Sequence, residues 1–262
     1  MRYSKISFRS NEVLPYKFLG SAIRGVFGSS LKDVVCINPS RECKGCFAKD
    51  GCLFYEFYEM DNPKFRLNLE MGGKLDFDII LFNDKAPYVI SALYKAFREK
   101  GITKERIKPD FKLYFNDELI FDGEFRRFDN KMLEFKSDER EGEITLTLKT
   151  PLRIKEKGKF VRDDINVETI LRSIHHRKCK LTDSKITKLD FKGEWEVLDK
   201  DLSFVDLVRF SNRQKSKMKL GGIVGEIKLR VDKKTYKMLK LGELIGVGKQ
   251  TTFGLGRVEI GE

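Results

Sequence analysis

A glycine-rich segment near the C-terminus carries a cation and two hydroxyls at close spacing. It comprises residues 246–256 and places Gly248, Lys249, Thr251 and Thr252 among further glycines. Glycine tolerates positive φ and lets a backbone or a phosphate approach closely, and successive main-chain N–H groups of such a loop can hold an anion. The spacing differs from that of the nucleotide P-loop. The sequence therefore predicts either a loop that holds a polyanion or a tight β-hairpin without a ligand.

Four cysteines between residues 36 and 52 have a spacing that suits one metal ion. Cys43 and Cys46 are separated by Lys-Gly, so two thiolates can reach one tetrahedral ion, and Cys36 and Cys52 complete four ligands. We expect a structural zinc that stabilises a turn-rich excursion. The alternatives are an iron–sulfur cluster of non-standard spacing, free thiols, or disulfides formed on oxidation. Cys179 stands alone and is interpreted as a packed or exposed thiol.

The two histidines of the chain are adjacent, His175 and His176. Histidine is the usual general base because its pKa lies near neutrality. Neighbouring residues of a helix do not face the same way, so at most one of the two would point at a given site. The alternative is a solvated helix face shared with Arg172, Arg177 and Lys178.

The composition is that of a folded and strongly basic chain. Hydrophobic residues make up 40% of the 262 residues, which is enough to build a core, and the formal net charge is +12. Such a charge favours nucleic acid or an anionic membrane as the partner. The sequence has neither a membrane-spanning apolar run nor a signal peptide, so we expect a cytoplasmic protein without a membrane partner. In that compartment cysteines are more often thiols or metal ligands than disulfides.

The elements that must position these residues follow one order twice. In the first half, alternating and helical patterns predict strands at 2–8, 65–70, 74–82, 111–115 and 119–121, and helices at 14–31 and 87–100. Pro15 suits the first turn of the first helix. The order is β-α-β-β-α-β, and the cysteine-rich segment 36–52 is an insertion in it.

The second half repeats this order. Strands are predicted at 143–148, 191–198, 222–231 and 253–260, and helices at 166–178 and 233–241, whereas 202–214 is ambiguous. Thr150-Pro151 is expected to interrupt the first of these strands, and Gly242 to stop the last helix. Two such units describe an α+β protein of two tandem ferredoxin-like domains, 1–140 and 141–262.

Three segments in the second half are similar to the CRISPR repeat-processing endoribonucleases of the RAMP superfamily. They are 209–214, 218–225 and the glycine-rich segment, and 23–28 followed by the cysteines resembles a subset of that family. The resemblance implies two ferredoxin-like domains side by side. It also implies that CRISPR repeat RNA is bound and cleaved without a metal or other cofactor, leaving a 2′,3′-cyclic phosphate and a 5′-hydroxyl.

The implied reaction needs a base for the 2′-hydroxyl, a cation for the charged phosphorane and an acid for the leaving oxygen. The family's usual catalytic histidine lies near the first helix of the first domain, where this chain has none. Three readings are open. His175 or His176 acts from the second domain; Tyr16, Lys17 or Lys32 acts near the first helix by positioning RNA and stabilising charge; or the protein binds repeat RNA and does not cut it.

The candidates for RNA contact are cations and loop residues of the resembling segments. The guanidinium of arginine can donate two hydrogen bonds to phosphate oxygens and can stack on bases, while lysine acts as a point charge. The candidates are Arg24, Arg209, Arg213, Lys215, Lys217, Lys219, Gly248, Lys249, Thr251 and Thr252. For Arg24 the alternative is an arginine on a helix surface.

Three functions are therefore weighed. The first is a metal-independent endoribonuclease that matures CRISPR RNA. The second is a non-cleaving relative that holds repeat or guide RNA, as part of a CRISPR effector complex. The third is a zinc-stabilised structural subunit without RNA contact, against which the net charge of +12 argues. The oligomeric state, monomer or homodimer, is open.

Overall fold

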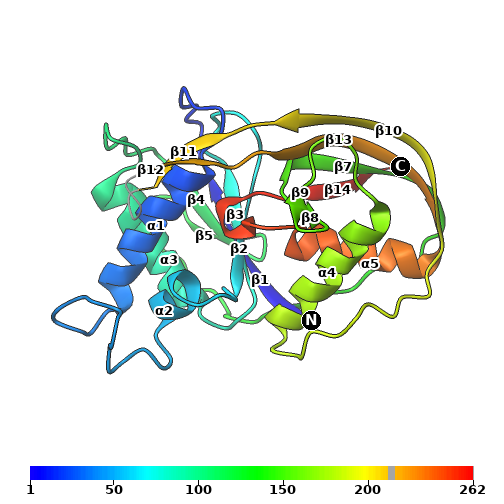
Figure 1. Cartoon of the computed structure of the whole chain (residues 1–262). Helices are drawn as coiled ribbons and strands as arrows, with labels where there is room; N and C mark the ends of the chain where they lie inside the picture. Colours follow the sequence, from blue (N-terminus) through cyan, green and yellow to red (C-terminus); the bar gives the residue numbers. More distant parts are fainter. Residues whose placement is uncertain (212–215, 262) are drawn as a thin grey trace. The chain divides into compact units, whose positions relative to one another are not determined.

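The structure, a computed structural model, describes residues 1–211 and 216–261, and for 208–211 and 216–218 it describes the backbone alone. It divides into two compact units, Met1–Glu134 and Phe135–Glu262, each with a sheet and helices of its own (Figure 1). The division falls six residues before the boundary expected from the sequence, 140/141 against 134/135.

The first unit has the β-α-β-β-α-β order, extended by additional short strands. Its elements are β1 (Arg2–Arg9), α1 (Gly20–Val35), α2 (Leu53–Tyr58), β2 (Phe65–Leu69), β3 (Phe77–Leu81), α3 (Ala86–Tyr94), the π-helix η1 (Lys95–Lys100), β4 (Lys112–Phe115), β5 (Glu118–Phe121) and β6 (Leu133–Glu134). The antiparallel sheet has the order β2-β3-β1-β4-β5, with β6 also pairing β1. This is a ferredoxin-like arrangement.

Aromatic side chains fill the core of the first unit. The ring of Phe8 lies 4.9 Å from that of Phe77, 4.3 Å from that of Phe97 and 4.8 Å from that of Phe111, centroid to centroid. Helix α1 presents Ile23, Phe27 and Leu31 to this core at helical spacing, and all three are fully buried. The cysteine-rich insertion connects α1 to α2 at the margin of this core.

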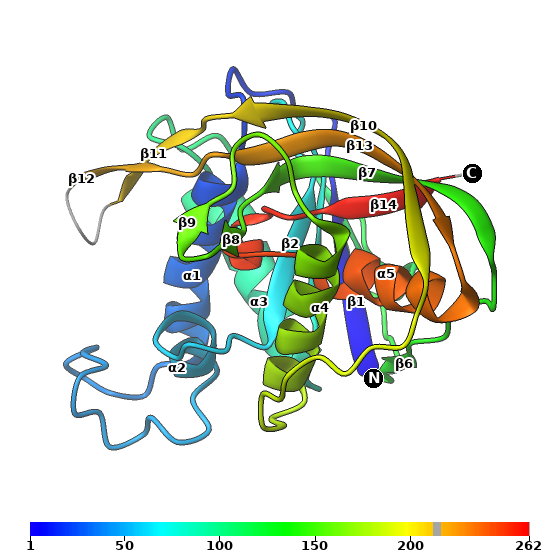
Figure 2. The same cartoon turned by 45° about the vertical axis from the view of Figure 1, so that its right-hand side comes forward.

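The second unit repeats the topology. Its elements are β7 (Gly142–Leu152), β8 (Lys155–Glu156), β9 (Lys159–Phe160), α4 (Val167–Leu181), β10 (Trp195–Val205), β11 (Val208–Ser211), β12 (Ser216–Lys219), β13 (Gly222–Val231), α5 (Lys233–Ile245), the 3₁₀ helix η2 (Thr251–Phe253) and β14 (Val258–Gly261). The antiparallel sheet has the order β10-β13-β7-β14. Helices α4 and α5 lie side by side on one face of it (Figure 2). The predicted α+β, ferredoxin-like fold class is confirmed.

Side-chain caps define where the two helices of this unit begin. The Asn166 side-chain oxygen accepts the N–H of Glu168 at 2.9 Å, and the Asp232 carboxylate accepts that of Thr235 at 2.8 Å. Each bond satisfies one N–H that the helix leaves without an intrahelical partner. The sequence predicted both starts to within one residue.

The first helix does not begin at Leu14, as the sequence analysis expected. The N–H of Leu14 instead donates to Gly73 O at 2.8 Å, one of several backbone bonds that pair this segment with residues 72–75. A Cβ atom at Gly73 would lie 1.7 Å from Leu14 O, so the close approach requires glycine. Pro15 therefore precedes the helix, and α1 begins only at Gly20.

Local stop signals were also wrong in the second unit. Strand β7 continues through Thr150-Pro151, because its register against β13 shifts there and Pro151 O accepts the N–H of Gly256 at 3.2 Å. Helix α5 continues through Gly242, which packs so close to Ile174 that a Cβ atom would lie 2.6 Å from Ile174 Cδ1.

The strand boundaries differ as well. Residues 251–253 form a 3₁₀ turn, so the last strand begins at Val258 rather than at residue 253. Strand β10 runs from Trp195 to Val205, beyond the predicted 191–198, because its second half pairs with the start of β13.

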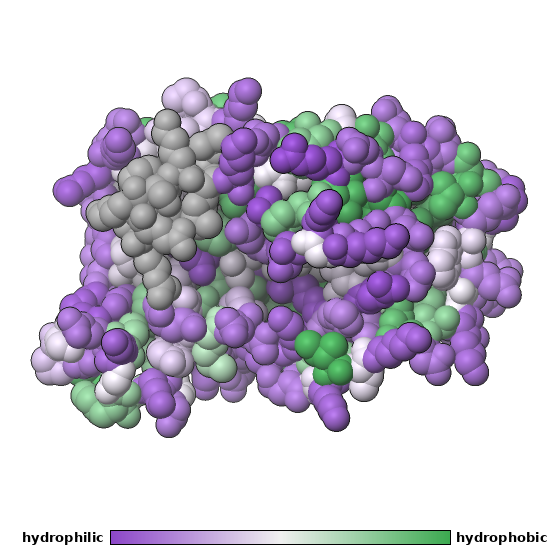
Figure 3. Space-filling model, viewed as in Figure 1, coloured by the Kyte–Doolittle hydropathy of each residue, from purple (hydrophilic) through white to green (hydrophobic). Residues whose placement is uncertain are grey.

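The surface is dominated by polar and charged residues. The face drawn in Figure 3 is mostly hydrophilic, with apolar residues in small patches. None of the helices among the described residues combines the length and the apolar character that a membrane span requires.

Candidate functional site

The glycine-rich segment 246–256, called the glycine loop below, leaves the end of α5 and leads to β14. Its four glycines and Gln250 all have positive φ, between 64° and 83°. Two close approaches exclude any larger residue: a Cβ atom would lie 1.8 Å from Val247 O at Gly256, and 2.7 Å from Arg153 O at Gly248. Backbone geometry alone thus accounts for much of the glycine pattern.

Several main-chain N–H groups of the loop are used inside the protein. Val247 donates to Gly256 O at 2.9 Å, Gly248 to Ser173 Oγ at 2.9 Å, and Lys249 to Arg153 O at 2.8 Å. These three groups are therefore not free to hold an anion, which was one of the two alternatives that the sequence left open for this loop. The Lys249 side chain is exposed, whereas Thr251 and Thr252 are 2% and 7% exposed. The loop is a rigid support that presents a lysine.

Helix α4 fixes the loop through two residues one turn apart. Ser173 accepts the N–H of Gly248, and Arg177 Nε donates to Ile245 O, the last residue of α5, at 2.5 Å. A guanidinium suits this position because the last carbonyls of a helix lack partners and carry partial negative charge. Burial lowers the pKa of Arg177 to about 10, so it remains charged at neutral pH. The alternative of a solvated helix face shared by Arg172, Arg177 and Lys178 therefore does not hold for Arg177.

Arg153, which the sequence analysis did not single out, joins three segments. Its carbonyl accepts the N–H of Lys249, its Nη1 donates to Gly221 O at 3.0 Å, and its Cζ lies 3.7 Å from the centroid of the Phe160 ring. The glycine loop, the turn before β13 and the β8–β9 hairpin therefore meet at the end of β7. Cations interleaved with an aromatic residue in 153–162 were the sequence signal for this site.

The basic segment 209–219 contains several of the predicted RNA contacts. Strands β11 and β12 pair as a hairpin, with Arg209 opposite Met218 and Lys217 opposite Phe210 in the backbone register. The side chains of Arg209 and Lys217 lie outside the described part of the structure, as do Arg213 and Lys215 entirely. Lys219 is exposed, with its Nζ 3.6 Å from Asp206.

The histidines do not both face the glycine loop. His175 Nε2 lies 3.3 Å from Thr187 Oγ1 and 3.7 Å from Cys179 Sγ. On a helix of 3.6 residues per turn it points away from the face that Ser173 presents. His176 precedes Arg177, and burial, with the charge of His175, lowers its pKa below the ordinary value of 6.5. His176 is therefore neutral at neutral pH, the form that can accept a proton.

The candidates of the first unit lie at opposite ends of α1. Tyr16 is exposed before the helix, beside Glu105, whose pKa is lowered mainly by the Thr103 hydroxyl and also by that of Tyr16. Lys32 lies in the last turn, with its Nζ 4.9 Å from the centroid of the Phe54 ring. The helix rises about 18 Å from Gly20 to Lys32, so Tyr16 and Lys32 do not reach the same phosphate.

Arg24 packs on Tyr58. The guanidinium carbon lies 4.3 Å from the Tyr58 ring centroid, and the Tyr58 hydroxyl donates to Arg24 O at 2.8 Å. A Cβ atom at Gly28 would lie 2.5 Å from this ring, so the glycine makes room for it, and burial raises the pKa of Tyr58. The motif at 23–28 therefore has a packing function within the first unit.

The cysteine-rich insertion is a series of turns. Cys46 N donates to Cys43 O, Lys49 N to Cys46 O, and Cys52 N to Lys49 O, at 3.2–3.4 Å. Cys36, Cys43, Cys46 and Cys52 are half-buried free thiols, and burial raises the pKa of Cys43. Across residues 1–211 and 216–261, no three His, Cys, Asp or Glu side chains are close enough to hold one metal ion. The four thiols are not gathered around one point in this structure, and zinc binding stays a prediction.

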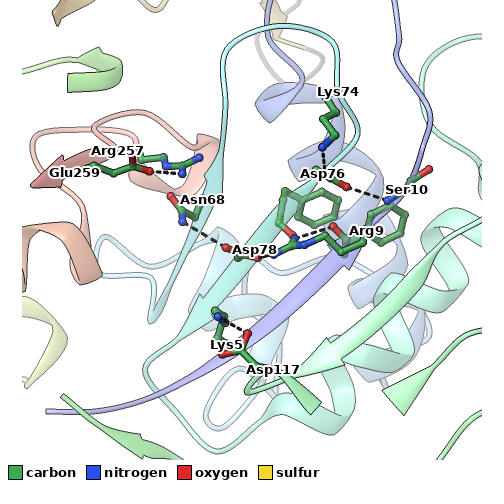
Figure 4. Close-up of polar contacts among 12 residues, drawn as sticks. Lys5, Arg9, Ser10, Asn68, Lys74, Asp76, Asp78, Asp117, Arg257 and Glu259 are labelled. Atoms are coloured by element: carbon green, nitrogen blue, oxygen red, sulfur yellow. Dashed lines mark hydrogen bonds and ion pairs between the residues drawn. The ribbon is translucent and has the colours of Figure 1, made fainter. Parts of the chain in front are cut away.

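A charged cavity of about 440 Å³ lies in the first unit, at the ends of β1, β3, β4 and β5. Three of its four cations pair with carboxylates: Arg9 with Asp78 at 2.6 Å, Lys74 with Asp76 at 2.7 Å, and Arg98 with Asp110 at 3.5 Å. Figure 4 shows the first two of these pairs, together with the N–H of Ser10 donating to Asp76. Phe111 contributes an apolar wall.

Two family models and one curated relative match this chain. Residues 146–258 match the family model described as CRISPR-associated endoribonuclease Cas6, and residues 3–70 match that of an N-terminal domain, AF_1859_N. The Cas6 match spans the glycine loop, α4 and the β8–β9 hairpin. A relative of uncharacterized function from Archaeoglobus fulgidus is 24% identical over an alignment of 269 positions, gaps included, which covers 91% of this chain and 90% of that protein.

Solved structures show the same fold. A Cas6 product complex is 17% identical, with 98% of each chain covered and a TM-score of 0.60. Thermus thermophilus Cas6 is 14% identical, with 99% of this chain and 97% of that chain covered and a TM-score of 0.51. A RAMP protein described as binding different RNA substrates is 12% identical over 100% of both chains, with a TM-score of 0.51.

Proposed function

Because the resemblance to CRISPR repeat-processing endoribonucleases is confirmed by the Cas6 match, we propose that this chain binds CRISPR repeat RNA and cleaves it. Cleavage proceeds without a metal ion, by attack of a 2′-hydroxyl on the adjacent phosphate, and leaves a 2′,3′-cyclic phosphate and a 5′-hydroxyl. The observation that carries the proposal is the glycine loop, a backbone fixed to α4 and β7 that exposes Lys249.

Fixing the loop before RNA arrives favours binding. Three backbone hydrogen bonds hold the residues around Lys249, so little main-chain freedom is lost when its ammonium meets a phosphate. The contact releases a counterion, so RNA binding by Lys249 should weaken as salt rises. Lys219, exposed in the same unit, is a further candidate contact.

His176 is our candidate for the base that accepts the proton of the 2′-hydroxyl. Its lowered pKa keeps it neutral at pH 7, and on α4 it follows Ser173, which accepts the Gly248 N–H, by three residues or about one helical turn. His175 is a weaker candidate because Thr187 and Cys179 surround its Nε2. From the first unit, Tyr16 and Lys32 are alternative candidates, either Tyr16 for protonating the leaving oxygen or Lys32 for stabilising charge.

A non-cleaving RNA-binding protein is the second candidate function. The two histidines of the chain are His175 and His176 in the second unit, so the first unit has no histidine to act as the general base. A protein that binds repeat RNA without cutting it would pass the RNA to a partner, such as a CRISPR effector complex. A structural subunit without RNA contact is the third candidate, and the net charge of +12 argues against it.

The test is incubation of the protein with its genome's own repeat RNA in EDTA, with a matched substrate that carries a 2′-deoxy group at the cleavage position. Cleavage of the first RNA alone, with a cyclic phosphate on the product, supports the proposed reaction. His176→Ala should then abolish cleavage while RNA binding persists, and His175→Ala, Tyr16→Phe and Lys32→Ala are compared with it. Binding without cleavage supports the second function, and absence of binding supports the third.

For the cysteine-rich insertion we propose a structural zinc, held by Cys36, Cys43, Cys46 and Cys52. The proposal is supported by four half-buried thiols, Cys36 at the end of α1 and the other three on the successive turns that follow, and it requires these turns to close around the ion. Such an ion would stabilise an insertion that has little core of its own. Metal analysis of protein purified without added metal, with a thermal melt before and after chelation, tests it. One zinc per chain and a lower melting temperature after chelation are expected, whereas iron or a metal-free protein would contradict the proposal.

A further inference from the structure

The hairpin at the end of β7 is unusually basic. Residues 153–162, called the basic hairpin below, contain five cations, Arg153, Lys155, Lys157, Lys159 and Arg162, and one carboxylate, Glu156. That carboxylate faces the start of α4, where its Oε1 accepts the N–H of Asn166 at 3.2 Å. Lys155, Lys157 and Lys159 are exposed, and none forms an ion pair with a described residue. Positive charge is thus concentrated here without internal neutralisation.

An aromatic side chain organises the hairpin. Phe160 is opposite Lys155 in the register, and its ring centroid lies 4.9 Å from Lys155 Nζ and 3.7 Å from Arg153 Cζ. Cation–π contacts of this kind hold the two cations over the ring faces. The turn itself is tight, with φ of 46° at Lys157 and 82° at Gly158. The hairpin therefore has a defined shape, unlike a solvated run of lysines.

The same residues connect the hairpin to the glycine loop. Arg153 begins the hairpin, and its carbonyl accepts the N–H of Lys249 at 2.8 Å. One residue before it, the backbone of Leu152 approaches Gly222 so closely that a Cβ atom there would lie 2.7 Å from the Leu152 carbonyl. Lys249 and the basic hairpin are therefore both attached to the end of β7, whose backbone is held in place by these contacts.

We propose that the basic hairpin is a second RNA contact, in which Lys155, Lys157 and Lys159 bind phosphates of the strand that Lys249 also holds. The inference rests on the proposed function, because it names a further part of the same RNA-binding surface. The ligand is the phosphodiester backbone of single-stranded RNA, which lysine recognises through charge and without base specificity. Phe160 is a positioning residue that keeps Arg153 and Lys155 in place.

The experiment compares two triple variants of the full chain that lose the same charge. One is Lys155→Gln, Lys157→Gln and Lys159→Gln in the basic hairpin. The control is Lys185→Gln, Lys188→Gln and Lys192→Gln, three exposed lysines of the same unit. The affinity for repeat RNA is measured at several salt concentrations, together with Lys249→Ala and the unchanged protein. Thermal melts confirm that every variant is folded.

The hairpin variant should bind more weakly, and its salt dependence should fall by about 2 in the slope of log affinity against log salt, because each single-strand contact contributes about 0.7. The control should keep the slope of the unchanged protein. Equal losses in both variants would mean diffuse attraction and would overturn the proposal. A hairpin variant that binds normally, while Lys249→Ala does not, would overturn it and leave the proposed function standing. If the unchanged protein binds no RNA, the proposed function fails, and this inference with it.

Discussion

The charged cavity of the first unit and the basic hairpin of the second use similar side chains in different ways. In the cavity, Arg9, Lys74 and Arg98 each lie within 3.5 Å of a carboxylate. In the hairpin, lysines at 155, 157 and 159 are exposed and form no ion pair with the described residues. Cations of the first kind already have a carboxylate partner, whereas cations of the second kind remain available to a polyanion. The net charge therefore says little about where RNA binds until the pairing of each cation is known.

The rigid support beneath Lys249 should give the largest effect. Gly256→Ala forces a Cβ atom to within 1.8 Å of Val247 O at a φ of 68°, so we expect a loss of about 3 kcal/mol or more in the free energy of unfolding. Gly158→Ala is the matched control, because its φ is 82° and no atom lies within 4 Å of the added Cβ. It should cost about 1 kcal/mol. Urea unfolding of both variants measures the difference, and equal losses would mean that the glycine loop is not held as tightly as described.

Arg9 tests the structural role of the cavity cations. Its Nη1 donates to Phe8 O and Phe77 O at 3.0 Å, and its Nη2 to Asp78 at 2.6 Å. Arg9→Met leaves these acceptors without their donor and should cost about 2 kcal/mol of stability. Lys112→Met, an exposed lysine of the same cavity, should change stability by less than about 0.5 kcal/mol.

Measurements of RNA affinity show whether Arg9, unlike the hairpin lysines, makes no contribution to RNA binding. Under conditions where it is folded, Arg9→Met should bind repeat RNA as the unchanged protein does. If its affinity falls as far as that of the hairpin variant, the cavity cations belong to the RNA surface and the contrast between the two regions is lost.

Much of the fold could be predicted because its signals are local. Alternation and helical spacing give the β-α-β-β-α-β order, and capping residues such as Asn166 and Asp232 mark helix starts. The errors arose where a distant partner overrides a local rule. Pro151 stays in a strand because a register shift accommodates it, and Gly242 stays in a helix because Ile174 needs its space. Neither partner can be recognised from the neighbouring residues.

The site was harder to predict for the same reason. The spacing of Lys249 and its glycines makes them candidates, but nothing in that spacing points to Arg153 and Arg177, which fix the loop. Arg177 does continue the apolar stripe of α4, three residues after Ile174, and this position is the sequence signal for its burial. For Arg153 the signal was the neighbouring aromatic, Phe160. A charged residue in a basic run should therefore be checked for its position in the helical or strand periodicity before it is predicted to be exposed to solvent.

Lys249 should show a smaller effect, confined to RNA binding. Lys249→Ala removes one exposed cation and should lower the salt slope of RNA affinity by about 0.7, with little change in stability. Lys74→Ala is the comparison from the first unit, since Lys74 is paired with Asp76 at 2.7 Å. Its RNA affinity and slope should not change. A normal slope for Lys249→Ala would show that the glycine loop serves packing alone.

The smallest expected effect on stability comes from His176, and it is visible as a pH dependence. Burial, with the charges of His175 and Arg172, lowers its pKa in the folded protein below 6.5. Between that lowered pKa and 6.5 the unfolded chain binds more protons, so stability rises with pH and is lost as pH falls below 6.5. His176→Gln should flatten the unfolding free energy in this window, and an unchanged profile would mean that burial does not shift this group. A flattened profile means that the imidazole is neutral at pH 7, which is the state that a proton acceptor in RNA cleavage requires, and a cleavage rate that falls with the same apparent pKa would connect the two measurements.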